Sequence, residues 1–109
     1  MALPRSAVQI LLALGEGERH GYALMRDVEA ATAGTVKLGP GTLYTTLARL
    51  EADGLIEESE ARPDPVLDDQ RRRYWRLTAA GRAVAVAEVR RLAAVVEKAR
   101  PWAMEDGAG

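Results

Sequence analysis

The sequence contains no cysteine, and this absence excludes several classes of protein. Without a thiol the chain has no disulfide framework, no thiolate zinc site and no cysteine nucleophile. Histidine is almost as scarce, since His20 is the only one among 109 residues. Its neighbours Arg19 and Gly21 form neither a pair of metal ligands nor the nucleophile elbow of a hydrolase. We therefore expect a protein that is not an enzyme and that carries no metal or other cofactor.

Apolar runs of membrane-spanning length are also missing. No segment approaches the roughly 20 apolar residues that cross a bilayer, whereas 48% hydrophobic and 28% charged residues are ordinary values for a soluble globular protein. The run at residues 7–14 leads into Glu16 and Glu18 without the cleavage pattern of a signal peptide. These features predict a cytoplasmic protein. A single domain of 109 residues buries a core only marginally, so a partner subunit would help to stabilise it.

An excess of positive charge is missing as well. The net charge is -1 and the pI is about 5.8, which taken alone argues against nucleic-acid binding, because neutralisation of phosphates dominates its affinity. The distribution of charge matters more than the total. Residues 71–76 contain four arginines and no acid, whereas residues 57–70 contain six acids against Arg62 alone. The basic charge is therefore gathered in one short segment.

The first half of the chain predicts two helices. Residues 6–14 are apolar on nearly all sides, and such a helix should be covered on both flanks. Residues 21–33 place Leu24, Val28 and Ala31 on one face, which predicts an amphipathic helix that Gly34 stops. The β-branched segment at residues 35–38 is either one short strand or a linker.

A third helix is expected at residues 40–53. Gly39 is an acceptable N-cap, Pro40 suits the first helical position, and Gly54 supplies the stop. An inward stripe at i, i+4 and i+7 consists of Leu43, Leu47 and Leu50. The opposite face is small and polar, with Gly41, Thr45, Ala48, Arg49 and Ala52 at its centre and Thr42 and Tyr44 at its flanks.

The second half predicts a β-hairpin and a long helix. Residues 55–59 and 72–77 suit two strands, joined by a long loop whose prolines prevent regular pairing. Thr78 can cap a helix at residues 79–100 that Pro101 ends. A stripe with the spacing of a coiled-coil seam contains Ala85, Val89, Leu92, Val96 and Ala99. This stripe either packs on its own domain or meets a second copy of the chain, and the length of the helix, about 30 Å, favours dimerisation.

This order of elements predicts a winged helix-turn-helix with a C-terminal dimerisation helix, in a mainly α (α+β) fold. The DNA-binding domain should occupy residues 1–77 and the dimerisation helix residues 78–101, and residues 102–109 should form a disordered tail. The third helix would enter the major groove, where small residues and hydroxyl groups lie close to the bases. The arginines of residues 71–76 would lie on the second strand of the wing.

Four motifs give the chain a specific resemblance. These are "HGY" at residues 20–22, "PGTLY" at 40–44, "LEADGLI" at 50–56 and "RRYWRLTAAGR" at 72–82. In this order and spacing, the chain resembles the PadR family of bacterial transcriptional regulators from about residue 8 to residue 82. The single C-terminal helix is similar to the compact subfamily, in which that helix mediates dimerisation and some members bind flat aromatic compounds at or near the interface.

The resemblance implies roles for particular residues. Thr42 and Tyr44 would contact phosphates near the start of the recognition helix, and Thr45 and Arg49 would lie in the groove. On the wing, the matching positions are Arg72 and Arg73. The implied function is that of a homodimeric repressor, which binds a pseudo-palindromic stretch of double-stranded DNA and is released by a small aromatic effector.

The sequence departs from the family pattern at three places. Gly39 stands where the family often has serine, so a capping hydroxyl and a possible phosphate contact are missing. The wing loop carries Asp64, Asp68 and Asp69, which phosphate would repel, so the tip is expected to point away from DNA or to contact it weakly. Trp75 replaces the usual tyrosine, a change that affects packing more than recognition.

Other interpretations stay open for individual residues and for the whole chain. His20 and Tyr22 are interpreted as structural, a helix start and a core aromatic. Trp102 either covers the apolar edge of the dimer or stacks on a flat effector. The chain as a whole could act mainly as a small-molecule sensor, or as a winged-helix module that binds proteins and has little affinity for DNA.

Overall fold

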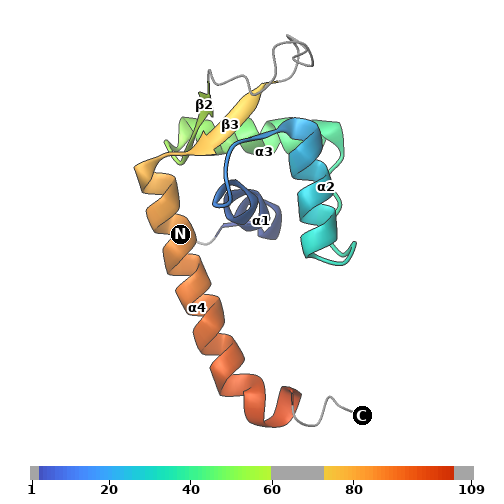
Figure 1. Cartoon of the computed structure of the whole chain (residues 1–109), viewed down its shortest axis with the longest axis vertical. Coiled ribbons are helices and arrows are strands. Elements are labelled where there is room, and N and C mark those ends of the chain that lie inside the picture. The colour runs from blue at the N-terminus through green and yellow to red at the C-terminus, as the bar shows by residue number, and fades with distance from the viewer. Residues whose placement is uncertain (1–2, 60–72, 105–109) are drawn as a thin grey trace.

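The computed structural model describes residues 3–59 and 73–104, which form four helices and a small antiparallel sheet (Figure 1). In chain order the elements are α1 (Arg5–Leu14), β1 (Arg19–His20), α2 (Gly21–Ala31), α3 (Pro40–Ala52), β2 (Ile56–Ser59), β3 (Tyr74–Leu77) and α4 (Ala79–Ala103). Strands β2 and β3 lie at the end of the molecule opposite the tip of α4 (Figure 1). None of the helices in this described part has the length and apolar character needed to cross a membrane. The predicted winged-helix class and all four predicted helices are confirmed.

Helix α1 forms the centre of the core. It lies between α2, α3 and α4 (Figure 1), and most of its length is buried, as its apolar composition predicted. The inward stripe of α3, formed by Leu43, Leu47 and Leu50, packs against this core and is almost fully buried. The apolar periodicity of α3 therefore fixes which of its faces remains in solvent.

The sheet has the strand order β1-β3-β2, with both pairings antiparallel. Strands β2 and β3 form the predicted hairpin, whose register pairs Ile56 with Leu77 at its base. The short strand β1 was not predicted; it exists because Arg19 and His20 pair with Trp75 and Tyr74 of β3. The wing loop with Asp64, Asp68 and Asp69, and the wing residues Arg71 and Arg72, lie outside the described residues.

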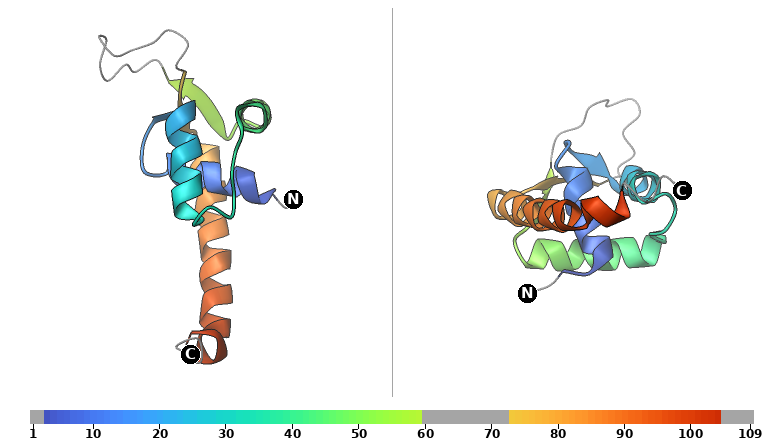
Figure 2. Two further views of the ribbon diagram at one scale, coloured as in Figure 1. Left: turned by 90° about the vertical axis from the view of Figure 1, so that its right-hand side faces the viewer. Right: turned by 90° about the horizontal axis from the view of Figure 1, so that it is seen from below.

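Helix α4 leaves the core and extends well beyond it (Figures 1 and 2). The prediction that Pro101 ends this helix is wrong, because α4 continues through Pro101 to Ala103 and the Met104 amide still donates to the Arg100 carbonyl (3.1 Å). A proline in a last turn removes one hydrogen bond and bends the helix without stopping it, and the final turn leaves the axis in Figure 1. Trp102, which was assigned to a disordered tail, is therefore helical, and residues 105–109 lie outside the described residues.

Candidate nucleic-acid interface

The outer face of α3 is an exposed, mostly small and polar surface. Thr42, Tyr44, Thr45 and Arg49 are all exposed, as expected from the leucine stripe on the opposite side. Among the described residues, no hydrogen bond or ion pair engages the Arg49 guanidinium. This face thus presents hydroxyl groups and one cation that is available to an external partner.

The N-terminal end of α3 is also open. Gly39 is the N-cap in an extended conformation and Pro40 follows at the first helical position, as predicted, and no side chain caps the helix. The first amide groups of a helix have no partner inside it and carry the positive end of its dipole. A Cβ atom built on Gly41 would meet nothing within 4 Å. The end of α3 can therefore receive an anion such as a phosphate.

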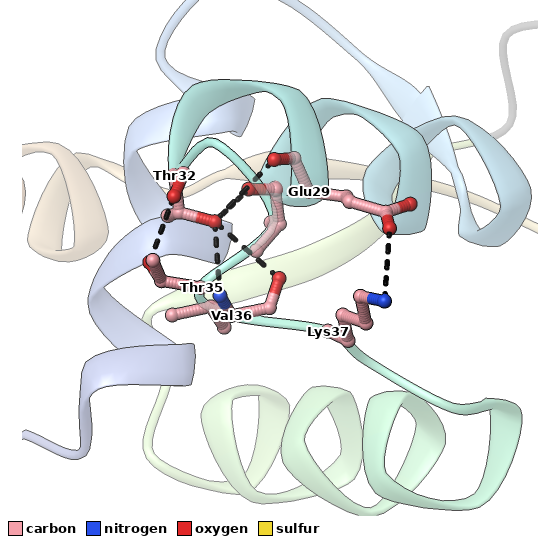
Figure 3. Close-up of polar contacts among 6 residues, drawn as sticks. Glu29, Thr32, Thr35, Val36 and Lys37 are labelled. Carbon is pink, nitrogen blue, oxygen red and sulfur yellow. Dashed lines mark hydrogen bonds and ion pairs between the residues drawn. The ribbon is translucent and has the colours of Figure 1, made fainter.

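Residues 32–39, between α2 and α3, position this end of α3 through hydrogen bonds to Thr32 (Figure 3). The Thr32 hydroxyl donates to the Val28 carbonyl (2.8 Å) and accepts from the Val36 amide (3.1 Å), and the Thr35 hydroxyl donates to the Thr32 carbonyl (2.7 Å). Of the two predicted alternatives for residues 35–38, the structure has the linker and no strand.

Tyr44 packs against the start of α2. A Cβ atom on Gly21 would lie 2.8 Å from the Tyr44 hydroxyl oxygen and 3.1 Å from a methyl group of Leu43. His20 is the helix start that was predicted, because its Nδ1 atom accepts a hydrogen bond from the Ala23 amide (3.2 Å). The prediction for Tyr22 is wrong: its side chain is 61% exposed and lies outside the core. Tyr22 is thus a second exposed tyrosine, one residue from the contact between Gly21 and Tyr44.

The two described arginines of the wing are paired with acids. Arg73 donates to Glu58 (2.6 Å), and its guanidinium lies 5.1 Å from the centre of the Trp75 ring. The hydrogen bond to Glu58 is the main cause that raises the pKa of Arg73. Arg76 pairs with Glu57 (2.8 Å), its cross-strand neighbour. The acids nearest to these two arginines belong to β2, so a phosphate at Arg73 would have to compete with Glu58.

The predicted seam of α4 has two parts. Ala85 is 8% exposed and packs in the core of its own chain, so the structure corrects its assignment to the surface that meets a partner. Farther along the helix, beyond the body, the apolar side chains of Val89, Leu92 and Val96 are exposed. Ala99 is half-buried on the same stripe. The stripe therefore begins as core and continues as an uncovered apolar surface.

A cavity lies where α4 separates from α1. Its volume is about 280 Å³, and its lining contains Leu11, Leu12, Gly15, Leu77, Arg82, Ala85, Val86, Val89 and Arg90. Trp102 is 68% exposed and does not belong to this lining. Sixteen residues of helix, about 24 Å, separate it from Val86, so a ligand in this cavity would be out of reach of Trp102 in the same chain.

Comparison with known proteins identifies the family. The family model of the PadR-like transcriptional regulators matches residues 10–87. The chain belongs to the PadR-like family. This family consists of transcriptional regulators that bind DNA and not of enzymes, which agrees with the expectation drawn from the scarcity of cysteine and histidine.

The chain is similar to proteins of known sequence and to a solved structure. It is 45% identical to the transcriptional regulator Rv3488 of Mycobacterium tuberculosis over 89 residues, which cover 80% of this chain and 76% of that protein. It is 41% identical to an uncharacterised 37.1 kDa protein in transposon TN4556 of Streptomyces fradiae, over 67% of this chain but only 19% of that protein. A PadR family transcription regulator from Clostridium difficile R20291 superposes with a TM-score of 0.71 at 19% identity, over 91% of this chain and 98% of that one. The last likeness shows the fold alone.

Proposed function

We propose that this PadR-family regulator is a homodimeric repressor that acts in the cytoplasm and recognises a specific sequence of double-stranded DNA. The observation that carries the proposal is the outer face of α3, an exposed and uncapped helix end followed by an arginine that no described acid neutralises. A surface of this kind fits the major groove, where phosphate contacts fix the register and side chains reach the base edges.

Within this proposal the residues have separate roles. Thr42 and Tyr44 bind phosphates at the start of α3, and Thr45 and Arg49 lie in the groove. Arg73, together with Arg72, contacts the DNA backbone beside the wing. We add Tyr22 to this set, because it is exposed and stands next to the residue on which Tyr44 packs.

Dimerisation through α4 is a condition of this function. A single α3 offers one cation, Arg49, that is not paired with any other described residue. One helix would therefore bind weakly, and two copies are needed for useful affinity. The exposed stripe of α4, with Val89, Leu92 and Val96, supports a two-fold interface. In such a dimer each recognition helix reads one half-site, with the two half-sites about one helical turn, roughly 34–36 Å, apart.

The cavity between α1 and α4 is the place we propose for a small aromatic effector. Its volume of about 280 Å³ and its mainly apolar lining suit a flat molecule of modest size. Arg82 and Arg90 line it, and neither forms an ion pair with another described residue. If the two copies of α4 pack antiparallel, with the two-fold axis at Leu92, the partner's Trp102 lies opposite Arg82. Cavity and tryptophan would then form one site between the two copies.

Titration of the protein with aromatic compounds, followed by tryptophan fluorescence, tests the effector. Binding should change the emission of the wild-type chain and lower its affinity for DNA, and Trp102→Phe should remove most of the emission change. If DNA affinity stays constant at saturating ligand, the regulator has no effector of this class.

One other function is supported by a specific observation. The pairing of Arg73 with Glu58 and of Arg76 with Glu57 leaves the described part of the wing nearly neutral, which would suit a winged-helix module that binds proteins. A gel shift with fragments of the source genome separates the two functions. Specific retention of a subset of fragments, weakened by added salt, supports the DNA-binding regulator.

A further inference from the structure

The turn that ends α3 and the start of α4 are joined at the base of the wing by hydrogen bonds from both the backbone and the side chain of Thr78. Helix α3 ends in a Schellman motif: the Leu55 amide donates to the Leu50 carbonyl (3.0 Å) and the Gly54 amide to the Glu51 carbonyl (2.9 Å). Gly54 has the positive φ of 76° that this motif requires. The turn that follows α3 thus presents the Gly54 and Leu55 carbonyls to the start of α4.

Thr78 uses both carbonyls. Its amide donates to the Leu55 carbonyl (3.1 Å), and its hydroxyl donates to the Gly54 carbonyl (2.6 Å). The same hydroxyl oxygen accepts a hydrogen bond from the Gly81 amide (3.0 Å), and so caps α4 at its N-terminus. The side chain of Thr78 therefore caps the N-terminus of α4 and also binds it to the turn that ends α3.

Gly81 shows how closely the first turn of α4 approaches the turn that follows α3. A Cβ atom at this position would lie 1.8 Å from the Leu55 carbonyl oxygen, which is backbone and cannot rotate away. Only glycine allows the first turn of α4 to lie on this carbonyl. The joint consequently has one close-packed geometry with little room for adjustment.

The joint connects the two surfaces on which the proposed function depends. Helix α3 carries the DNA-binding face, and α4 carries the apolar stripe that meets the second copy. Helix α4 extends for about 37 Å, so a tilt of about 5° at the joint displaces its far end by roughly 3 Å. This displacement is close to the rise of one base pair, about 3.4 Å. A loose joint would therefore let the two recognition helices accept half-sites at several separations.

We infer that Thr78 is a positioning residue, which sets the spacing between the two half-sites that the dimer accepts. The inference rests on the proposed homodimeric function. It assigns to Thr78 a role in selecting DNA, in addition to the capping of α4.

Two substitutions separate the tether from the cap. Thr78→Asp keeps a good N-cap acceptor for the Gly81 amide but has no proton to donate to Gly54, because an ionised carboxylate only accepts. Thr78→Ser retains both hydrogen bonds and serves as the matched control. Since both residues are favoured N-caps, both variants should fold and show similar thermal unfolding.

The first experiment measures spacing selectivity. The full-length wild-type chain selects its preferred duplex from a random pool, and fluorescence anisotropy gives the Kd for this duplex and for versions with one base pair inserted or deleted between the half-sites. We expect the inserted or deleted base pair to weaken the binding of the wild type and of Thr78→Ser at least about 10-fold. The same alteration of the duplex should weaken the binding of Thr78→Asp about 3-fold or less. The charge added by aspartate weakens binding to every duplex alike, so it cancels in the ratio of the Kd for the altered spacing to the Kd for the preferred spacing. An equal penalty in all three proteins would overturn the inference and leave the proposed function standing.

The second measurement needs no DNA. Because the chain contains no cysteine, a spin label on Ala48→Cys, on the exposed face of α3, reports the distance between the two recognition helices of the dimer. The distance distribution should be narrow with Thr78 or Thr78→Ser and clearly broader with Thr78→Asp. Equal widths would contradict the inference, whereas the absence of any inter-label distance would overturn the proposed homodimer and the inference with it.

Discussion

Gly21 and Tyr44 are in contact across the two helices of the helix-turn-helix. A Cβ atom on Gly21 would lie 2.8 Å from the Tyr44 hydroxyl oxygen, a distance that a carbon atom and an oxygen atom do not tolerate. The glycine of the "HGY" motif therefore makes room for the tyrosine of the "PGTLY" motif. The two motifs, which lie apart in the sequence, form one unit that fixes a side chain on the proposed DNA-binding face.

Gly21→Ala should impair DNA binding more than folding. The new methyl group displaces the Tyr44 ring, whose far end can move, so we expect the free energy of unfolding to change by less than about 1 kcal/mol. We expect DNA affinity to fall about 10-fold, which corresponds to about 1.4 kcal/mol. Denaturant unfolding and fluorescence anisotropy measure the two quantities.

The control for Gly21→Ala is the double variant with Tyr44→Phe. Loss of the hydroxyl removes the closest contact, so the two substitutions should be clearly non-additive in the free energy of DNA binding. If their effects add, displacement of Tyr44 is not the cause of the loss.

Gly39→Ser should strengthen both folding and DNA binding. No side chain caps α3, and the space around a Cβ atom at Gly39 is open. A serine at an N-cap is better than glycine by a few tenths of a kcal/mol and adds a hydroxyl beside the first-turn amides. We expect a small rise in the thermal midpoint and about 2- to 5-fold tighter binding, or roughly 0.4–1 kcal/mol. Unchanged DNA affinity together with a raised midpoint would show that no phosphate lies at this end of α3.

Glu58→Gln should raise the affinity for DNA. Glu58 holds the Arg73 guanidinium at 2.6 Å, and replacing it with an amide removes a negative charge and releases the cation for phosphate. The matched control is Glu57→Gln, the same change on the adjacent residue of β2, which pairs with Arg76 and points to the other face of the sheet. We expect about a 5-fold gain for Glu58→Gln and a smaller one for the control. Equal gains would mean that only net charge matters and that Arg73 does not reach DNA.

Leu92→Glu should convert the dimer into monomers. Leu92 lies near the middle of the exposed apolar stripe of α4, and a two-fold interface would bring the two introduced carboxylates close together. Ala94→Glu, on the opposite side of the same helix, is the control and should remain dimeric. Sedimentation velocity gives the mass of each variant. A dimeric Leu92→Glu variant would exclude this stripe as the interface.

The sequence predicted those helices whose apolar residues recur with a regular local period. The leucine stripe at i, i+4 and i+7 placed α3 to within one residue of its observed end, and Gly39, Pro40 and Gly54 marked its limits. The same stripe correctly predicted that Thr42, Tyr44, Thr45 and Arg49 are exposed. A regular repeat in an amphipathic helix identifies its buried face without knowledge of the rest of the chain.

Features that depend on distant residues were not predictable in this way. Strand β1 has two residues and no periodicity, and it is defined only by its pairing with Trp75 and Tyr74. Tyr22 was expected in the core, but α2 packs through Leu24 and Val28 instead. The ion pair between Arg73 and Glu58 depends on the register of the hairpin, which a long loop leaves undetermined.

The most direct test of the account is the salt dependence of binding to a duplex selected by the full-length protein, compared between the wild-type chain and Arg49→Ala. Arg49 is a cation of α3 that forms no ion pair with another described residue, so each recognition helix that enters a groove should release counterions at this residue. We expect two wild-type chains to bind each duplex, with an affinity that falls steeply as the salt concentration rises. Arg49→Ala should reduce the slope of log K against log salt concentration by about 2, one for each copy. Equal slopes for the two proteins, or the absence of salt-sensitive binding, would contradict the proposal that α3 of this regulator lies on DNA.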